Sequence, residues 1–205
     1  MDVLSRVVGP VATNVYVLAD ERSKEAIAID TATPCLPWIA DELSERGWTL
    51  KLIVSSHGHW DHIGDNAGLA EHTGAEIGVH PLDRHRLVHP DPIWAPFEIV
   101  PSVPAVELAE SGEIRFGAIR LQVLHTPGHT EGSVCLYAAD DGLLFSGDTL
   151  FAGSFGRFDL LGGDVRLLGA SLRRLAALPP RTAVLPGHGE PTIIGKEAWL
   201  KRIGM

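Results

Sequence analysis

Three histidines and one aspartate fall within six residues of one another, at His57, His59, Asp61 and His62. Imidazole nitrogens and carboxylate oxygens are the groups that divalent transition metals accept as ligands. The cluster directly follows the apolar run 50–54, which is typical of a strand buried on both faces. A loop that leaves such a strand can direct several side chains to one point, so this pattern predicts a metal site.

Three further candidate ligands lie downstream, each in a polar or glycine-rich turn that follows an apolar run. They are His129, Asp148 and His188. Glycines beside each ligand let the backbone turn sharply and keep bulk away from a bound ion. Seven protein ligands are too many for one tetrahedral zinc, but they suit two metals about 3.5–4 Å apart with one carboxylate between them. We find no convincing serine or cysteine nucleophile in the sequence.

The segments around the first cluster alternate between expected strands and helices. Residues 14–19 and 25–30 are β-branched or apolar runs separated by a polar turn, which predicts a hairpin. Residues 37–46 carry apolar side chains on one helical face and end at a glycine, which predicts a helix. A second helix is expected over residues 63–72, and a short strand over residues 75–80.

The second half of the chain predicts an antiparallel sheet and one amphipathic helix. Residues 114–151 form a series of apolar or alternating runs separated by turns. Asp164 precedes a helical pattern of leucines and is expected to cap that helix. A last strand over residues 183–185 leads into the turn that carries His188.

Residues 81–104 interrupt this alternation with six prolines and with Trp94 and Phe97. Long irregular segments in compact domains often serve function, so a lid or a wall of a substrate pocket is one interpretation. A surface loop or subunit contact whose aromatic residues pack down is the other. The oligomeric state stays open, with a homodimer as one outcome, because residues 199–203 could also form a contact or cover the core.

Length and composition favour a single globular domain over residues 1–205 that does not bind nucleic acid. Hydrophobic residues make up 45% of the chain and charged residues 21%, as in ordinary globular proteins. A formal charge of −9 without a basic patch argues against nucleic-acid binding. Because no apolar run approaches the roughly 20 residues of a membrane span and only two cysteines occur, we expect a cytoplasmic protein without disulfides.

The motif HxHxDH, followed by isolated His, Asp and His residues in this order, resembles the metallo-β-lactamase superfamily across residues 14–192. The resemblance implies a four-layer αββα sandwich of two mixed sheets flanked by helices. It also implies two divalent ions, with zinc expected and iron or manganese as alternatives. Their ligands would be His57, His59 and His129 for the first metal, Asp61, His62 and His188 for the second, and Asp148 between them. Asp61 and Asp148 would thus be catalytic residues, holding a metal-bridging hydroxide for hydrolysis.

Residues 148–159 are similar to the glyoxalase II branch, whose members hydrolyse S-acyl glutathione thioesters. This likeness implies that Arg157 anchors a glutathione carboxylate; a structural ion pair with Asp159 or Asp164 is the alternative. The sequence departs from that branch in two ways. It has no carboxyl-terminal helical domain after the last ligand, and Gly189-Glu190-Pro191 stands where the branch has a tyrosine. A small thioester hydrolase with an altered or broader substrate range is the interpretation that we prefer.

Three other functions use similar residues. A persulfide dioxygenase would hold a single iron through His57, His129 and Asp148. A dinuclear hydrolase could act instead on a lactone or a β-lactam. A non-catalytic binding module would have little need for seven ligands.

The remaining aromatic and histidine residues receive structural interpretations. His72, His80, His85, His89 and His125 lack partners at ligand spacing and are expected to be surface or structural histidines. Trp60 is expected to pack beneath the ligand loop, with a place in the pocket wall as the alternative.

Overall fold

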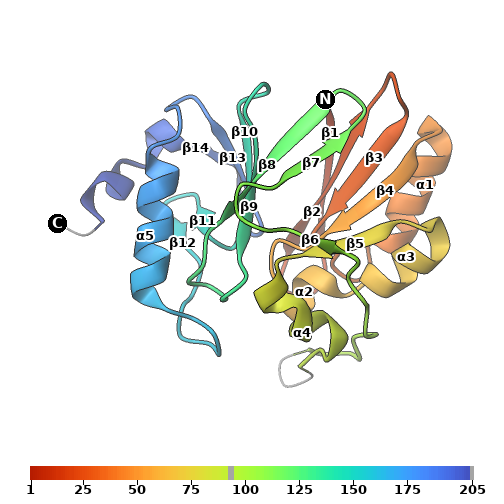
Figure 1. Ribbon diagram of the computed structural model, residues 1–205, viewed down its shortest axis with the longest axis horizontal. Helices are drawn as coiled ribbons and strands as arrows, with labels where there is room; N and C mark the ends of the chain where they lie inside the picture. Colours follow the sequence, from red (N-terminus) through yellow and green to blue (C-terminus); the bar gives the residue numbers. More distant parts are fainter. Residues whose placement is uncertain (92–94, 204–205) are drawn as a thin grey trace.

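The computed structural model describes residues 1–91 and 95–203, and the described strands form two six-stranded sheets and one short hairpin (Figure 1). The sequence-based interpretation of Trp94 therefore falls outside the described residues. The first sheet has the order β1-β2-β3-β4-β5-β6. Its strands are β1 (Asp2–Val8), β2 (Thr13–Asp20), β3 (Glu25–Ile29), β4 (Thr49–Val54), β5 (Glu76–Val79) and β6 (Val106–Glu107).

The first sheet is mixed. Strands β1, β2 and β3 pair antiparallel, which confirms the predicted hairpin, whereas β3, β4, β5 and β6 run parallel. Parallel neighbours place their carboxyl ends at the same edge of a sheet. The end of β4, where the first cluster begins, therefore lies beside the end of β3.

The second sheet has the order β14-β13-β10-β9-β8-β7, and only β10 and β13 in it are parallel. The predicted antiparallel pairing within residues 114–151 is thus confirmed. Its strands are β7 (Glu113–Phe116), β8 (Ile119–His125), β9 (Val134–Ala138), β10 (Leu143–Gly147), β13 (Ala183–Pro186) and β14 (Thr192–Ile193). A hairpin of β11 (Leu150–Phe151) and β12 (Ser154–Phe155) follows β10.

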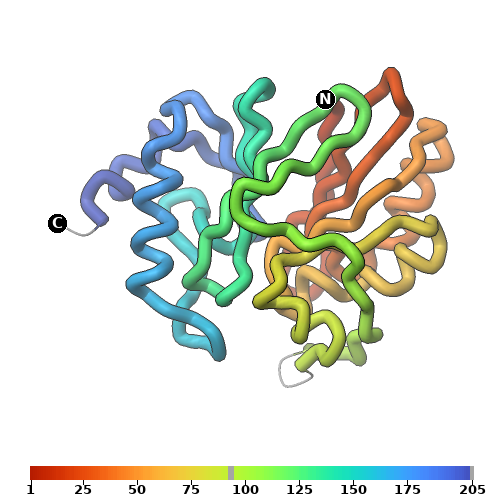
Figure 2. Tube along the Cα trace, viewed as in Figure 1, coloured from red at the N-terminus to blue at the C-terminus, as the bar shows by residue number. Residues whose placement is uncertain are grey.

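Helices cover the outer faces of both sheets. The first half of the chain builds one sheet with its helices and the second half builds the other (Figure 2). The α-helices are α1 (Leu36–Arg46), α2 (Trp60–Ile63), α3 (Asn66–Thr73), α4 (Arg84–Val88) and α5 (Val165–Ala176). Short 3₁₀ helices are η1 (Pro81–Asp83), η2 (Ile194–Lys196) and η3 (Ala198–Arg202). As predicted, the side chain of Asp164 caps α5 by accepting from the N–H groups of Arg166 and Leu167.

Three hydrophobic layers hold this arrangement together. The central layer lies between the sheets and includes Leu18, Leu136 and Phe145. A second packs the first sheet against α1 and α3, and a third packs the second sheet against α5 and η3. The alternation of helix, sheet, sheet and helix confirms the predicted αββα sandwich. The carboxyl-terminal segment covers the third layer, because Leu200 is buried there and Trp199 packs against it.

The structure corrects three sequence-based expectations. Strand β1 was not predicted, because it lies at a sheet edge with mostly exposed side chains. The helix expected over residues 63–72 begins only at Asn66, as α3, because Ile63 ends the separate turn α2 and the carboxylate of Asp65 accepts from the backbone N–H groups of Cys35 and Leu36. The segment 81–104 begins with η1 and α4 rather than with irregular chain.

Both cysteines are buried free thiols. Across residues 1–91 and 95–203, no helix combines the length and the apolar character that crossing a membrane requires.

Candidate metal centre

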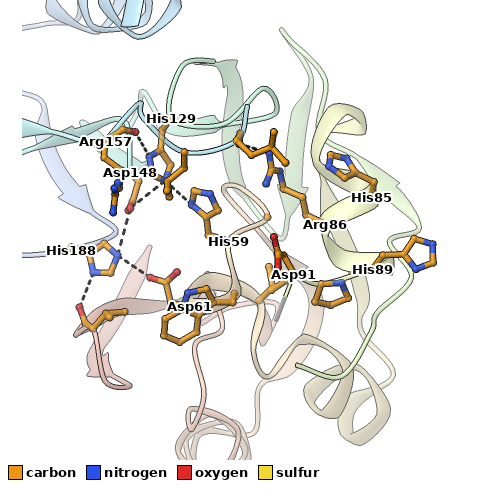
Figure 3. Close-up of a pocket in the computed structure, with 17 residues that line it drawn as sticks. His59, Asp61, His85, Arg86, His89, Asp91, His129, Asp148, Arg157 and His188 are labelled. Carbon is orange, nitrogen blue, oxygen red and sulfur yellow. Dashed lines mark hydrogen bonds and ion pairs between the residues drawn. The ribbon is translucent and has the colours of Figure 1, made fainter. Parts of the chain in front are cut away.

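The seven predicted ligands come together at one edge of the sandwich. Figure 3 shows His59, Asp61, His129, Asp148 and His188 among them. His57 and His59 follow β4, and Asp61 and His62 lie on the single turn of α2. The other three follow strands of the second sheet: His129 comes after β8, Asp148 after β10 and His188 after β13. Residues separated by up to 131 positions in sequence thus meet because strands from both sheets end at this edge.

The imidazoles of His57, His59 and His129 form the first group. His57 Nε2 lies 3.1 Å from His59 Nδ1 and 3.2 Å from His129 Nε2. His59 Nδ1 lies 2.9 Å from His129 Nε2. A neutral imidazole has only one N–H, so three nitrogens facing one another in a triangle cannot all be satisfied by mutual hydrogen bonds. They can all donate lone pairs to one metal ion, which fits the chemistry of the donor set.

Asp61, His62 and His188 form the second group. His188 Nε2 lies 3.1 Å from Asp61 Oδ2 and 3.2 Å from His62 Nε2, and His62 Nε2 lies 3.3 Å from Asp61 Oδ2. Two imidazoles and one carboxylate that converge in this way also fit a divalent ion.

The carboxylate of Asp148 lies between the two groups. Its Oδ2 is 3.6 Å from His129 Nε2 and 3.5 Å from His188 Nε2, and its Oδ1 is 3.5 Å from His62 Nε2. Asp148 Oδ1 is buried and has no hydrogen-bond partner. A buried carboxylate oxygen without a donor is costly unless a cation or another donor satisfies it, so this atom also fits a metal.

Asp30 and Ser56 orient two of the ligand imidazoles, and the sequence analysis missed both. Asp30 accepts from the backbone N–H and the hydroxyl of Ser56, and Ser56 Oγ lies 3.0 Å from His57 Nδ1. Asp30 Oδ2 also lies 3.0 Å from His62 Nδ1. Such partners fix which ring nitrogen faces a metal. The position of Asp30 just beyond β3, beside the parallel β4, is the signal that could have indicated it.

Backbone carbonyls orient two more ligands. His129 Nδ1 lies 2.7 Å from the carbonyl oxygen of Arg157, and His188 Nδ1 lies 3.1 Å from that of Val11. Donation from Nδ1 to these carbonyls leaves the Nε2 lone pair of each ring directed at the other ligands.

The turn that carries His188 is attached to β2 of the opposite sheet. Asn14 Nδ2 donates to the carbonyl oxygens of Pro186, at 2.9 Å, and of Gly189, at 2.8 Å. The hydroxyl of Tyr16 donates to the same Pro186 oxygen at 2.8 Å. The position of the last ligand is therefore set by residues from the amino-terminal hairpin.

The electrostatics favour the protonation states that metal binding needs in the first group and at Asp61. At His62 and His188 burial lowers the pKa, but nearby carboxylates outweigh it and raise the pKa overall. Burial, together with the neighbouring histidines, lowers the pKa of His57 well below its ordinary value and that of His59 to about 2. Burial raises the pKa of the Asp61 carboxyl, but His62 and His188 outweigh it and lower that pKa overall. Neutral imidazoles and an ionised carboxylate are the forms that coordinate metals.

A cavity of about 730 Å³ opens beside the ligands (Figure 3). Its wall includes His59 and Asp148, and its other sides include Trp60, His85 and His89. His85 and His89 are exposed, as expected of surface histidines, and they also belong to the pocket wall. Trp60 lines the pocket and also packs edge-on against Phe97, with ring centroids 5.7 Å apart. The loop that follows β5 thus supplies part of the wall, as one interpretation of residues 81–104 predicted.

Arg157 also lines this cavity, at the end away from α4. Its guanidinium makes two hydrogen bonds to the carboxylate of Asp159, at 2.8 and 2.9 Å, and both side chains are more than half exposed. The structure therefore contains the ion pair with Asp159 that was one of the two interpretations.

Comparisons with known proteins agree with the fold. The model of the metallo-β-lactamase superfamily matches residues 8–188. The chain belongs to the metallo-β-lactamase superfamily, as its motif predicted. A protein of Aquifex aeolicus (strain VF5), named only as uncharacterised, is 41% identical over 198 residues, which cover 93% of this chain and 90% of that protein.

A relative with a named activity matches this chain over only part of its own length. The hydroxyacylglutathione hydrolase of Maricaulis maris (strain MCS10) is 35% identical over 142 residues, which are 69% of this chain and 49% of that protein. The chain thus spans about half of the length of this relative.

Two solved structures are similar over nearly their whole length. The BLEG-1 B3 metallo-β-lactamase superposes with a TM-score of 0.86 at 34% identity, over 95% or more of both chains. TTHA1623 in a di-iron-bound form superposes with a TM-score of 0.84 at 36% identity and covers 95% of this chain and 96% of its own.

Proposed function

We propose that this protein is a dinuclear metallohydrolase that cleaves thioesters of the S-acyl glutathione type. The convergence of seven ligand side chains on one pocket supports metal-dependent hydrolysis. The likeness to a hydroxyacylglutathione hydrolase over 142 residues supports the thioester as the substrate. The match covers only 49% of that relative, so a carrier smaller than glutathione also fits the proposal.

The side chains divide the work between them. His57, His59 and His129 would hold one metal, Asp61, His62 and His188 would hold the other, and Asp148 would contribute to both. When bound, the two metals would supply a water of lowered pKa and polarise the acyl carbonyl. The protein orients the ligands through their outer hydrogen bonds and keeps the carboxylate of Asp61 ionised. Hydrolysis consumes one water, breaks the bond between the acyl carbon and sulfur, and releases a carboxylic acid and a thiol.

The metal-loaded protein is expected to hydrolyse S-lactoylglutathione or a simple acyl thioester at least about 100-fold faster than a lactone or a β-lactam, in terms of kcat/KM. A difference of this size corresponds to about 2.7 kcal/mol in transition-state stabilisation. Steady-state kinetics on this substrate panel, with metal content measured on the same samples, checks the expectation. One iron per chain together with oxygen consumption on a glutathione persulfide would instead indicate a dioxygenase.

A second candidate is β-lactam hydrolysis, which the likeness to the BLEG-1 enzyme favours. It needs the same two metals and differs only in what the pocket walls accept. The same panel separates the two, because a preference for the β-lactam would replace the thioester assignment while leaving the metal centre intact.

We expect the Arg157→Ala variant to raise KM for an anionic glutathione thioester about tenfold or more, with kcat nearly unchanged. A charge-assisted hydrogen bond to a substrate carboxylate contributes about 1.5–3 kcal/mol, and Arg157 faces the pocket. Asp159→Asn is the matched control, because it removes the competing carboxylate and should lower KM or leave it unchanged. Equal KM values for Arg157→Ala and the unaltered protein would show that Arg157 serves only the ion pair.

A further inference from the structure

Asp83 connects the two loops that carry all three residues of the first group, although it touches none of their rings. It is the last residue of η1, it is fully buried, and it lies outside the ligand motif. One loop contains His57 and His59 after β4, and the other contains His129 after β8. These loops belong to different sheets.

The carboxylate of Asp83 accepts hydrogen bonds from both loops. Its Oδ2 accepts from the backbone N–H of Gly58 at 2.8 Å and from the hydroxyl of Thr130 at 2.7 Å. Its Oδ1 accepts from the backbone N–H of Gly132 at 2.9 Å. Gly58 stands between two ligands and Thr130 directly follows the third, so each bond fixes backbone next to a ligand.

The backbone packs tightly around this carboxylate at two glycines. A Cβ at Gly58 would lie 2.5 Å from the Cβ of Arg86, and a Cβ at Gly132 would lie 2.7 Å from the carboxyl carbon of Asp83. Both loops therefore approach Asp83 and Arg86 so closely that only glycine fits at positions 58 and 132. Arg86 extends the contact to the pocket wall, because its Nη2 donates to the carbonyl oxygen of Leu161 at 2.8 Å.

We propose that Asp83 is a positioning residue that sets the spacing of the first-metal ligands. The inference rests on the two-metal centre of the proposed function. Only a carboxylate suits this place, because three donors from two loops point at its oxygens and an amide would turn an NH₂ group toward one of them. Metal ligands need their geometry fixed by such outer hydrogen bonds, whose loss typically weakens metal binding about 10–100-fold.

The decisive experiment compares Asp83→Asn in two backgrounds that report one metal each. His188→Ala removes a ligand of the second group and leaves the first to be titrated, and His59→Ala does the reverse. In the His188→Ala background, which reports the first metal, we expect Asp83→Asn to weaken zinc binding about 10–100-fold. In the His59→Ala background, which reports the second metal, we expect a weakening of less than about threefold. Zinc affinity is measured by competition with a chromophoric chelator, without any substrate.

Glu197→Gln is the matched control. Glu197 is also a buried carboxylate with three donors, namely the backbone N–H of Gly153, the hydroxyl of Thr192 and the indole N–H of Trp199. It joins the β11–β12 turn to the carboxyl-terminal segment. Glu197→Gln and Asp83→Asn should both lower the stability of the metal-free protein to urea. Glu197→Gln should leave the zinc affinity unchanged in both backgrounds.

Equal weakening in both backgrounds, or no weakening in a folded Asp83→Asn protein, would overturn the proposal. If Asp83→Asn does not fold, Thr130→Val decides, because it removes only one of the three donors and should weaken the first metal severalfold and the second not at all. Since these measurements need no turnover, a protein that binds two zinc ions but cleaves no thioester would refute the proposed substrate and leave the inference about Asp83 standing.

Discussion

The Asp148→Ala variant is expected to lose both metals and more than about 10³-fold in kcat/KM. Its oxygens lie within 3.6 Å of ring nitrogens from both groups, so its removal takes a ligand from each metal at once. Removing a single electrostatic group from an active site costs about 10²–10³-fold, and Asp148 serves both metals. Metal content after dialysis and thioester kinetics at saturating zinc are the measurements.

This result is informative only if the Asp148→Ala protein folds, so the experiment includes a structural control. Asp41→Ala changes an exposed aspartate on α1 and should retain both metals and full activity. Urea unfolding of the metal-free proteins compares their stabilities without the contribution of bound ions. An Asp148→Ala protein that still binds one metal as tightly as the unaltered protein would show that Asp148 does not join the two groups.

The Asp61→Ala variant is expected to lose one metal and keep the other. Asp61 Oδ2 lies 3.1 Å from His188 Nε2 and 3.3 Å from His62 Nε2. Removing a ligand itself should weaken the second metal by more than the roughly 10–100-fold that loss of an outer partner causes. The first metal should change by less than about threefold, and kcat/KM should fall about 100-fold. Metal content should drop from two ions to one per chain.

The mirror variant His59→Ala tests the same division from the other side. It should lose the first metal and keep the second, because His59 Nδ1 faces His57 and His129. If Asp61→Ala weakens both metals to the same extent, the two groups act as one site and the division between them is wrong.

Local sequence patterns predicted the parts of this molecule that depend on neighbouring residues. The helix that begins at Leu36 and the cap at Asp164 follow from periodicity and side-chain chemistry within a few positions. These two features need no knowledge of what lies far away along the chain. The αββα class was implied by the alternation of elements together with the resemblance to the metallo-β-lactamase superfamily, whose motif also includes the distant His129, Asp148 and His188.

Partners distant in sequence account for what was missed. Asp30 contacts Ser56 and Asp83 contacts Gly132, and neither aspartate has a local signature that separates it from a surface residue. Arg157 illustrates the same limit, because its sequence context allowed both a substrate anchor and an ion pair with a nearby aspartate. That the exposed His85 and His89 also line the pocket was missed, because it depends on where residues 81–91 lie relative to the ligands.

The attachment of the His188 turn to Asn14 and Tyr16 has a consequence for biosynthesis. A chain that emerges from the ribosome presents the complete first group once residue 129 is exposed, whereas the second group must wait for His188. Strand β2, which holds His188 in place, has by then long been synthesised. The two halves of the centre therefore become available in a fixed order during synthesis, and the second closes only when β2 and the turn after β13 have met.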